Sequence, residues 1–235
     1  MRNTCLKAIA VAAALSPAIG FAQSKPTAAT YITDEEVKAV NATPGIDRTI
    51  RVVDIGNENF AIGIIHRVAT GARGTGAGAG AGAGAARGGA NAAGGAGRGA
   101  GGGGGRAGGA AQPCGEQTTA PPSGGTPGGI AHDSQTEGYL IVSGGGTLVT
   151  GGRIVNGNKS APDAQVTTEL NGPSCSGTIV GSDVVKRVVK TGDIIIIPAG
   201  VPHGWTDITD HVDYLSFRPS DHVLQAGYVH PSIKK

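Results

Sequence analysis

Two short stretches of the chain hold the side chains best suited to chemistry. The first, AHDSQTEGYLIVSG, contains His132 and Glu137, and the second, GDIIIIPAGVPHGWTD, contains His203. Imidazole and carboxylate groups transfer protons and hold divalent metal ions. If the two stretches meet in the fold, they predict a site for acid–base or metal chemistry.

A predicted β-strand positions the groups of the first stretch. Alternation along this strand puts Glu137, Tyr139 and Ile141 on one face. His132 and Glu137 are an odd number of residues apart, so on one straight strand they would face opposite ways. They converge only if residues 133–136 form a turn or bulge, which their composition permits.

A second strand precedes the other histidine. Four consecutive isoleucines, residues 194–197, predict a strand that is buried on both faces. The Pro198 to Gly200 segment then turns the chain towards His203.

Short β-branched runs recur along the rest of the chain. TIRVVDI and NFAIGIIHRVA predict adjacent strands, YLIVSGGGTLVTGG predicts a hairpin around its three glycines, and HVDYLSFRP predicts a last half-buried strand. Residues 153–176 read as a longer polar excursion. TDEEVKAV predicts one short helix from about residue 34 to 41, opened by a capping box of Thr33 and Glu36. The pattern indicates a small all-β sandwich or barrel.

The two chemical stretches resemble the paired motifs of the cupin superfamily, G(x)5HxH(x)3–4E(x)6G and G(x)5PxG(x)2H(x)3N. The positions that fit are Gly124, His132, Glu137 and Gly144 in the first motif, and Gly192, Pro198, Gly200 and His203 in the second. The resemblance covers roughly residues 50–70 and 130–219. It implies a double-stranded β-helix, the jelly-roll barrel of that superfamily.

The sequence departs from these motifs at two positions. Ile130 stands where the first motif histidine is expected, and Asp207 where the final asparagine is expected. In metal-binding cupins the motif histidines and glutamate hold a divalent ion, so the resemblance leaves His132, Glu137 and His203 as ligands. That set suits Fe, Mn or Zn. The alternative is a barrel that has lost its metal, with both histidines hydrogen-bonded in a pocket and Glu137 paired to a nearby cation.

Other candidate residues surround this predicted centre. Tyr139, on the face of Glu137, is the expected proton donor. Ile130 and Trp205 are expected in the substrate pocket, although Trp205 could equally be a plug at the barrel mouth. His66 is expected to be ordinary packing or surface. The remaining histidines, predicted to lie apart on the surface, are His211, His222 and His230.

The N-terminus has the layout of a secretory signal peptide, with Arg2 and Lys7 before a short apolar run and small residues up to Ala22. Residues 1–22 are therefore expected to be removed, which makes the protein secreted or periplasmic. No later stretch is long enough to cross a bilayer. Of 19 basic residues, loss of two leaves 17 against 17 acidic ones. A neutral mature chain gives no reason to expect a nucleic-acid partner.

Two cysteines remain after the leader, Cys114 and Cys175. In an oxidising compartment they could form a disulfide. Two separate, partly buried thiols are the alternative, because sequence does not show how close their Cα atoms lie.

A Gly/Ala/Pro-rich tract occupies residues 71–129 and offers almost nothing large to bury. Such composition predicts a flexible insertion. A silk-like assembly and an RNA-binding tail are disfavoured, because the tract is short and carries no aromatic residues between its arginines. The remaining divisions are an N-terminal extension (23–49), first barrel strands (50–70), the barrel core (130–219) and a C-terminal tail (220–235).

Three functions compete at this level. The first is a metal-dependent enzyme of oxygenase or isomerase type acting on a small organic molecule. The second is a non-catalytic barrel that binds a sugar-like ligand, which Ile130 favours because it makes the cavity more apolar. The third is a structural envelope protein. A homodimer is expected from the cupin resemblance alone.

Overall fold

The computed structural model describes residues 25–71, 112–120, 122–220 and 223–233. The predicted signal peptide and most of the predicted insertion, residues 72–111, lie outside these ranges, as does His222. Among the described helices, none combines the length and the apolar character that a membrane span requires.

The first sheet contains five antiparallel strands. Its order is β1-β2-β11-β5-β9. The strands are β1 (Asp47–Asp54), β2 (Asn59–Val68), β11 (His211–Ser220), the first part of β5 (Glu137–Thr150) and β9 (Ile194–Ile197). The predicted last strand is therefore central in this sheet, between β2 and β5.

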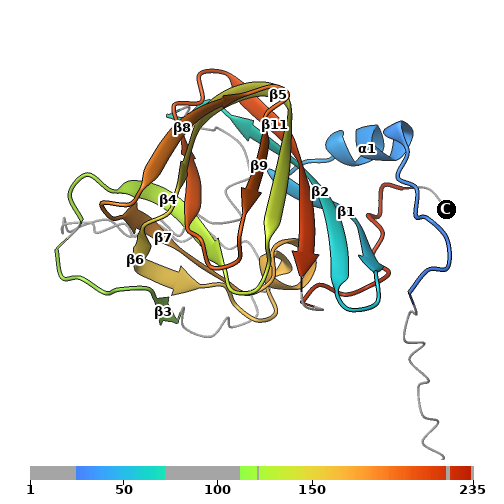
Figure 1. The fold of residues 1–235 in the computed structure, drawn as a ribbon, viewed down its shortest axis with the longest axis horizontal. Coiled ribbons are helices and arrows are strands. Elements are labelled where there is room, and N and C mark those ends of the chain that lie inside the picture. The colour runs from blue at the N-terminus through green and yellow to red at the C-terminus, as the bar shows by residue number, and fades with distance from the viewer. Residues whose placement is uncertain (1–24, 72–111, 121, 221–222, 234–235) are drawn as a thin grey trace, which may run out of the picture.

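The second sheet faces the first and shares β5 with it (Figure 1). Its order is β3-β6-β7-β4-β10-β5-β8, again antiparallel. The strands are β3 (Pro113–Cys114), β6 (Arg153–Lys159), β7 (Ser174–Val180), β4 (Thr126–His132), β10 (His203–Thr206) and β8 (Val185–Lys190). The all-β jelly-roll prediction is confirmed.

The predicted hairpin around residues 144–146 is wrong, because β5 runs through these glycines as one strand of 14 residues. An added Cβ would lie 2.0 Å from the His211 carbonyl oxygen at Gly144 and 2.5 Å from the Val189 carbonyl oxygen at Gly145. Gly144 also has a φ of +67°. Glycines here let the strand bend past close backbone neighbours and pass from one sheet to the other, instead of reversing it.

Three further expectations need correction. The isoleucine strand β9 is a sheet edge with Ile194 and Ile196 about three-quarters exposed, at 75% and 74%, so it is not buried on both faces. Residues 153–176 are no polar excursion, because they hold β6, a short π-helix η1 (Val166–Leu170) and the start of β7. Ordered strands also begin inside the predicted insertion, with β3 and β4, since both pair with the second sheet.

Aromatic and aliphatic side chains of both sheets form the main hydrophobic core of the barrel. This core comprises Ile65, Tyr139, Ile141, Leu148, Val189, Ile197, Trp205, Ile208, Val212 and Tyr214. The predicted helix α1 (Asp34–Asn41) forms with its capping box and lies outside the barrel (Figure 1). Its Val40 packs on Ile50 and Ile64, so α1 covers the outer face of β1 and β2.

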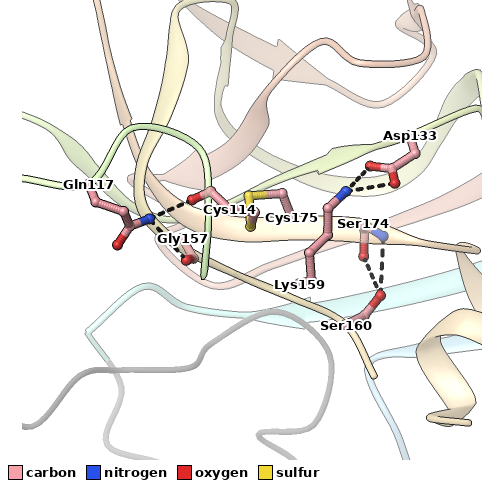
Figure 2. Close-up of a disulfide and its surroundings, with 8 residues drawn as sticks. All are labelled: Cys114, Gln117, Asp133, Gly157, Lys159, Ser160, Ser174 and Cys175. Carbon is pink, nitrogen blue, oxygen red and sulfur yellow. Dashed lines mark hydrogen bonds and ion pairs between the residues drawn. A yellow bond between two sulfur atoms is a disulfide. The ribbon is translucent and has the colours of Figure 1, made fainter. Parts of the chain in front are cut away.

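A disulfide joins Cys114 of β3 to Cys175 of β7, with Cα atoms 5.9 Å apart (Figure 2). Cys175 pairs in register with Ala131, the residue before His132. Close by, Lys159 contacts the Asp133 carboxylate at 2.6 Å. The disulfide therefore secures β3 and β7 beside the strand end that carries His132.

Removing this disulfide is expected to lower the free energy of unfolding by about 2–4 kcal/mol, since the bridge closes a loop across a sequence separation of 61 residues. The comparison is wild type against Cys114→Ala/Cys175→Ala in urea. Wild type under reducing conditions is the control and should fall to the level of the variant. An unchanged midpoint, or peptide mapping that finds both thiols free, would contradict the assignment.

Gly144→Ala is expected to destabilise the barrel by more than about 3 kcal/mol. Gly144 has a left-handed backbone conformation, and the new methyl group would clash with the His211 carbonyl oxygen. Gly128→Ala is the matched control. Gly128 has a φ of +74° but no atom within 4 Å of its added Cβ, so it should lose only about 1–2 kcal/mol. Equal losses at the two positions would show that crowding does not shape β5. Chemical denaturation measures both.

Candidate metal centre

Three strand ends meet inside the barrel and carry the predicted ligands. His132 ends β4, Glu137 begins β5 and His203 begins β10. All three are buried, with exposed fractions of 2%, 2% and 4%. Of the described residues, they alone form a group of three or more potential protein ligands, with ligand atoms within 4.8 Å of one another.

The convergence depends on two turns. The chain bends after His132, as the odd spacing to Glu137 required, and the Gly200 amide donates to the His132 carbonyl oxygen at 2.7 Å. This hydrogen bond places the Pro198 to Gly200 turn against the end of β4. β10 then starts with His203 paired to Ile130 on one side and to Thr150 on the other.

Both histidines direct Nε2 at the same carboxylate oxygen. The distances to Glu137 Oε2 are 3.3 Å from His132 and 3.1 Å from His203. His203 Nδ1 lies 3.1 Å from the Val201 carbonyl oxygen, which can only accept, so Nδ1 holds a proton. In a neutral His203 the Nε2 lone pair would therefore face a carboxylate oxygen. Such a contact is favourable only if a proton or a metal ion lies between the two atoms.

The two separations between the histidines and Glu137 agree with those expected around a divalent metal. Two ligand atoms each about 2.1 Å from one ion, at angles of roughly 90–109°, are about 3.0–3.4 Å apart. The two contacts to Glu137 Oε2 fall in this range. Two imidazoles and a carboxylate with open positions are a ligand set of non-haem iron sites, and they also suit zinc.

The other oxygen of Glu137 is held by a buried arginine. Arg218 Nε donates to Glu137 Oε1 at 3.1 Å and to Ser216 Oγ at 2.9 Å. Its terminal nitrogens donate to the Asp47 carboxylate at 2.5 Å and to the Leu170 carbonyl oxygen at 2.9 Å. Because Oε1 is fixed in this way, Oε2 points at the histidines.

The charge state of Glu137 follows from these partners. Burial by itself raises its pKa, but the interactions with His132, the hydrogen bond from His203 and the Arg218 guanidinium together hold that pKa well below its usual range. Glu137 is therefore ionised and is available to bind a cation.

Tyr139 lies beside the carboxylate, as its strand position predicted. Its hydroxyl donates to Glu137 Oε2 at 2.5 Å, and 3% of the residue is exposed. Burial and the Glu137 charge raise the pKa of Tyr139 well above its ordinary value. The phenol thus keeps its proton and helps to hold the carboxylate in place, while its role as proton donor stays a prediction.

The two predicted pocket residues lie next to the centre. Ile130 is buried and pairs with His203, so an aliphatic side chain stands where the motif expects a histidine. Trp205 is 9% exposed and stacks on Tyr214 with ring centroids 5.5 Å apart. Trp205 belongs to the barrel core, and its place in a substrate pocket stays a prediction.

Two histidines that the sequence separates lie side by side. His66 and His211 stack with centroids 6.2 Å apart. His66 Nδ1 contacts the Asp213 carboxylate at 2.5 Å, and His211 Nε2 contacts Ser143 Oγ at 2.6 Å. No pattern in the sequence indicated this neighbourhood between His66 and His211, which arises because β2 and β11 are adjacent in the sheet.

Sequence reasoning missed Arg218 and Asp47. A signal was present, since Arg218 lies an even number of residues from Val212 and Tyr214 on an alternating strand, and so shares their inward face. No comparable signal identified Asp47, which comes from β1, more than 150 residues away along the chain.

Comparisons with known proteins leave the family undecided. No protein-family model matches the sequence, and no curated protein matches it. Solved structures that align include oxalate oxidase in complex with the substrate analogue glycolate, at 13% identity, over 86% of this chain and 60% of that chain, with a TM-score of 0.30. Another is peruvianin-I, a cysteine peptidase from Thevetia peruviana latex, at 9% identity, over 72% and 54%, with a TM-score of 0.25. Likeness at this level carries no argument about function.

Arg218→Met is expected to lower the free energy of unfolding by about 3–5 kcal/mol, because it leaves the Asp47 and Glu137 carboxylates buried without their cation. Arg153→Met is the matched control. The Arg153–Glu116 pair is more than half exposed on the Arg153 side, so that variant should lose about 1 kcal/mol or less. Comparable losses in urea denaturation would show that the buried network does not stabilise the barrel.

Proposed function

We propose that this protein is an extracytoplasmic cupin-type barrel that binds a divalent metal and converts a small organic molecule by an oxygenase- or isomerase-type reaction. One observation carries the proposal: two buried imidazoles direct Nε2 at one oxygen of an ionised, buried Glu137. The signal-peptide pattern of residues 1–22 supports the extracytoplasmic location.

The residues of this centre would have distinct roles. His132, Glu137 and His203 would hold the ion, which when bound supplies Lewis-acid or redox chemistry. Arg218 orients Glu137 through Oε1 and offsets its charge. The Tyr139 hydroxyl presents a proton at Glu137 Oε2. Burial of the whole group restricts water at the reacting position.

The departure at Ile130 has a chemical consequence. This side chain offers no lone pair beside His203, so the protein would provide one ligand fewer than the full cupin motif contains. A metal held by His132, Glu137 and His203 then has more positions open to substrate or water, as catalytic sites require.

A metal-free ligand-binding barrel is the second candidate. The direct contacts of 3.1 and 3.3 Å between the imidazoles and Glu137 Oε2 also suit hydrogen bonds from protonated histidines. In that state the same charges are balanced without an ion, and the barrel would bind its ligand without converting it.

Metal analysis decides between the two. The protein purified without added metal or chelator is expected to contain close to one equivalent of Fe, Mn or Zn per chain, and His203→Ala to lose most of it. Glu137→Gln, which keeps the shape of the side chain but not its charge, should lose metal as well. Elemental analysis measures all three proteins.

His66→Ala is the control for this experiment, because its imidazole also contacts a carboxylate, that of Asp213, but lies outside the centre. It should retain the wild-type metal content. Absence of metal from wild type after dialysis against each of the three ions would exclude the metal-dependent enzyme and favour the binding barrel.

A further inference from the structure

A row of uncharged polar side chains crosses three adjacent strands of the first sheet. Asn59 begins β2, Ser220 ends β11, and Gln135 lies two residues before β5. Ser220 pairs with Asn59, and a β-bridge joins Gln135 to Ser220. All three are buried, at 4%, 2% and 1% exposed. They therefore form one continuous row, referred to below as the polar row.

The polar row faces the barrel interior beside the proposed centre. Ser220 follows Arg218 by two residues on the buried face of β11, and Gln135 precedes Glu137 by two. Positions two apart on a strand share a face and are about 6–7 Å apart. The row thus lies one side-chain repeat from the Glu137–Arg218 pair.

The polar row is not satisfied by the described part of the protein. Gln135 Oε1 and Nε2, Ser220 Oγ and Asn59 Oδ1 are enclosed, and no described residue hydrogen-bonds to them. Only the Asn59 amide nitrogen has a partner, the Leu224 carbonyl oxygen at 2.6 Å. Each unpartnered buried polar group destabilises a fold. Four such atoms in one row point to a ligand that satisfies them.

The hydrogen-bonding groups of the polar row indicate which class of ligand it can bind. A side-chain amide and a hydroxyl offer both donors and acceptors, and none of the three side chains carries a charge. Alcohol hydroxyls, which donate and accept, complement such a row. Arg218, two residues from Ser220 on β11, is already engaged by Glu137 and Asp47, so it has little capacity left for an anion.

We infer that the polar row binds the hydroxyl groups of a small neutral polyol or sugar and presents it to the His132–Glu137–His203 centre. This inference rests on the proposed function for the reacting end of the molecule and deepens it by naming the substrate class. Gln135, Ser220 and Asn59 are binding residues in this scheme, and none of them is a metal ligand.

The test is calorimetric titration of the full, Mn²⁺-loaded chain with D-xylose, D-glucose and glycerol, and with succinate as an anionic probe. At least one neutral probe is expected to bind with a Kd of about 1 mM or tighter. Gln135→Met and Ser220→Ala should each weaken that binding about tenfold while metal content stays unchanged. Gln117→Met makes the same substitution beside the disulfide, outside the row, and should bind like wild type.

Thermal unfolding without ligand provides a second readout. Gln135→Met is expected to have a higher melting temperature than wild type, because the amide that it removes is buried and forms no hydrogen bond within the described protein. A lowered melting temperature would mean that the amide has a structural partner, and would count against the inference.

The outcomes separate this inference from the proposed function. No binding of any neutral probe, preferential binding of succinate, or unchanged binding by Gln135→Met would each overturn the inference, while a bound metal would still support the centre. A neutral probe that binds the row in a protein unable to hold metal would support the inference on ligand class and overturn the proposed enzyme.

Discussion

The burial of one negative charge, that of Glu137, organises the interior of this barrel. An ionised carboxylate withdrawn from water costs several kcal/mol unless hydrogen bonds and opposite charges compensate it. Here Arg218 and Ser216 bind one oxygen, while Tyr139 and two histidines approach the other. These partners come from β4, β5, β10 and β11. The compensation of the Glu137 charge therefore connects both sheets.

The arginine that satisfies Glu137 has its own structural requirements. An added Cβ at Gly63 would lie 3.2 Å from the Arg218 guanidinium carbon, so the absence of a side chain on β2 makes room for this cation. The same guanidinium reaches Asp47 on β1 and the Leu170 carbonyl oxygen at the end of the π-helix η1. Elements far from the centre in sequence thus meet on one buried cation.

Strand β5 links this charge network to the histidines. Its first residue is Glu137, in the first sheet, and its last, Thr150, pairs with His203 in the second sheet. The glycines at its centre allow the bend that makes both pairings compatible with one strand. The Cys114–Cys175 disulfide secures β7 on the other side of β4. A barrel that buries several polar groups gains stability from this crosslink.

The sequence by itself determined the all-β class, the helix α1, and the local geometry at each chemical residue. Periodicity of two identified most strands, and the odd spacing between His132 and Glu137 required the turn that is observed. These properties depend on neighbours in the chain. For the same reason the glycines of β5 were misread, because a strand that bends past other strands has the same local composition as a turn.

Only the tertiary structure decided which residues meet across the barrel. The pairing of Arg218 with Asp47, the contact of His66 with His211, and the row of Gln135, Ser220 and Asn59 all depend on strand order, which local patterns do not encode. Exposure of the isoleucine strand was decided in the same way. β9 directs Ile197 into the barrel, while Ile194 and Ile196 lie on a face that no described residue covers, whereas hydrophobicity alone indicated full burial. Burial and partnership are properties of the assembled sheets, because they depend on what lies opposite each side chain.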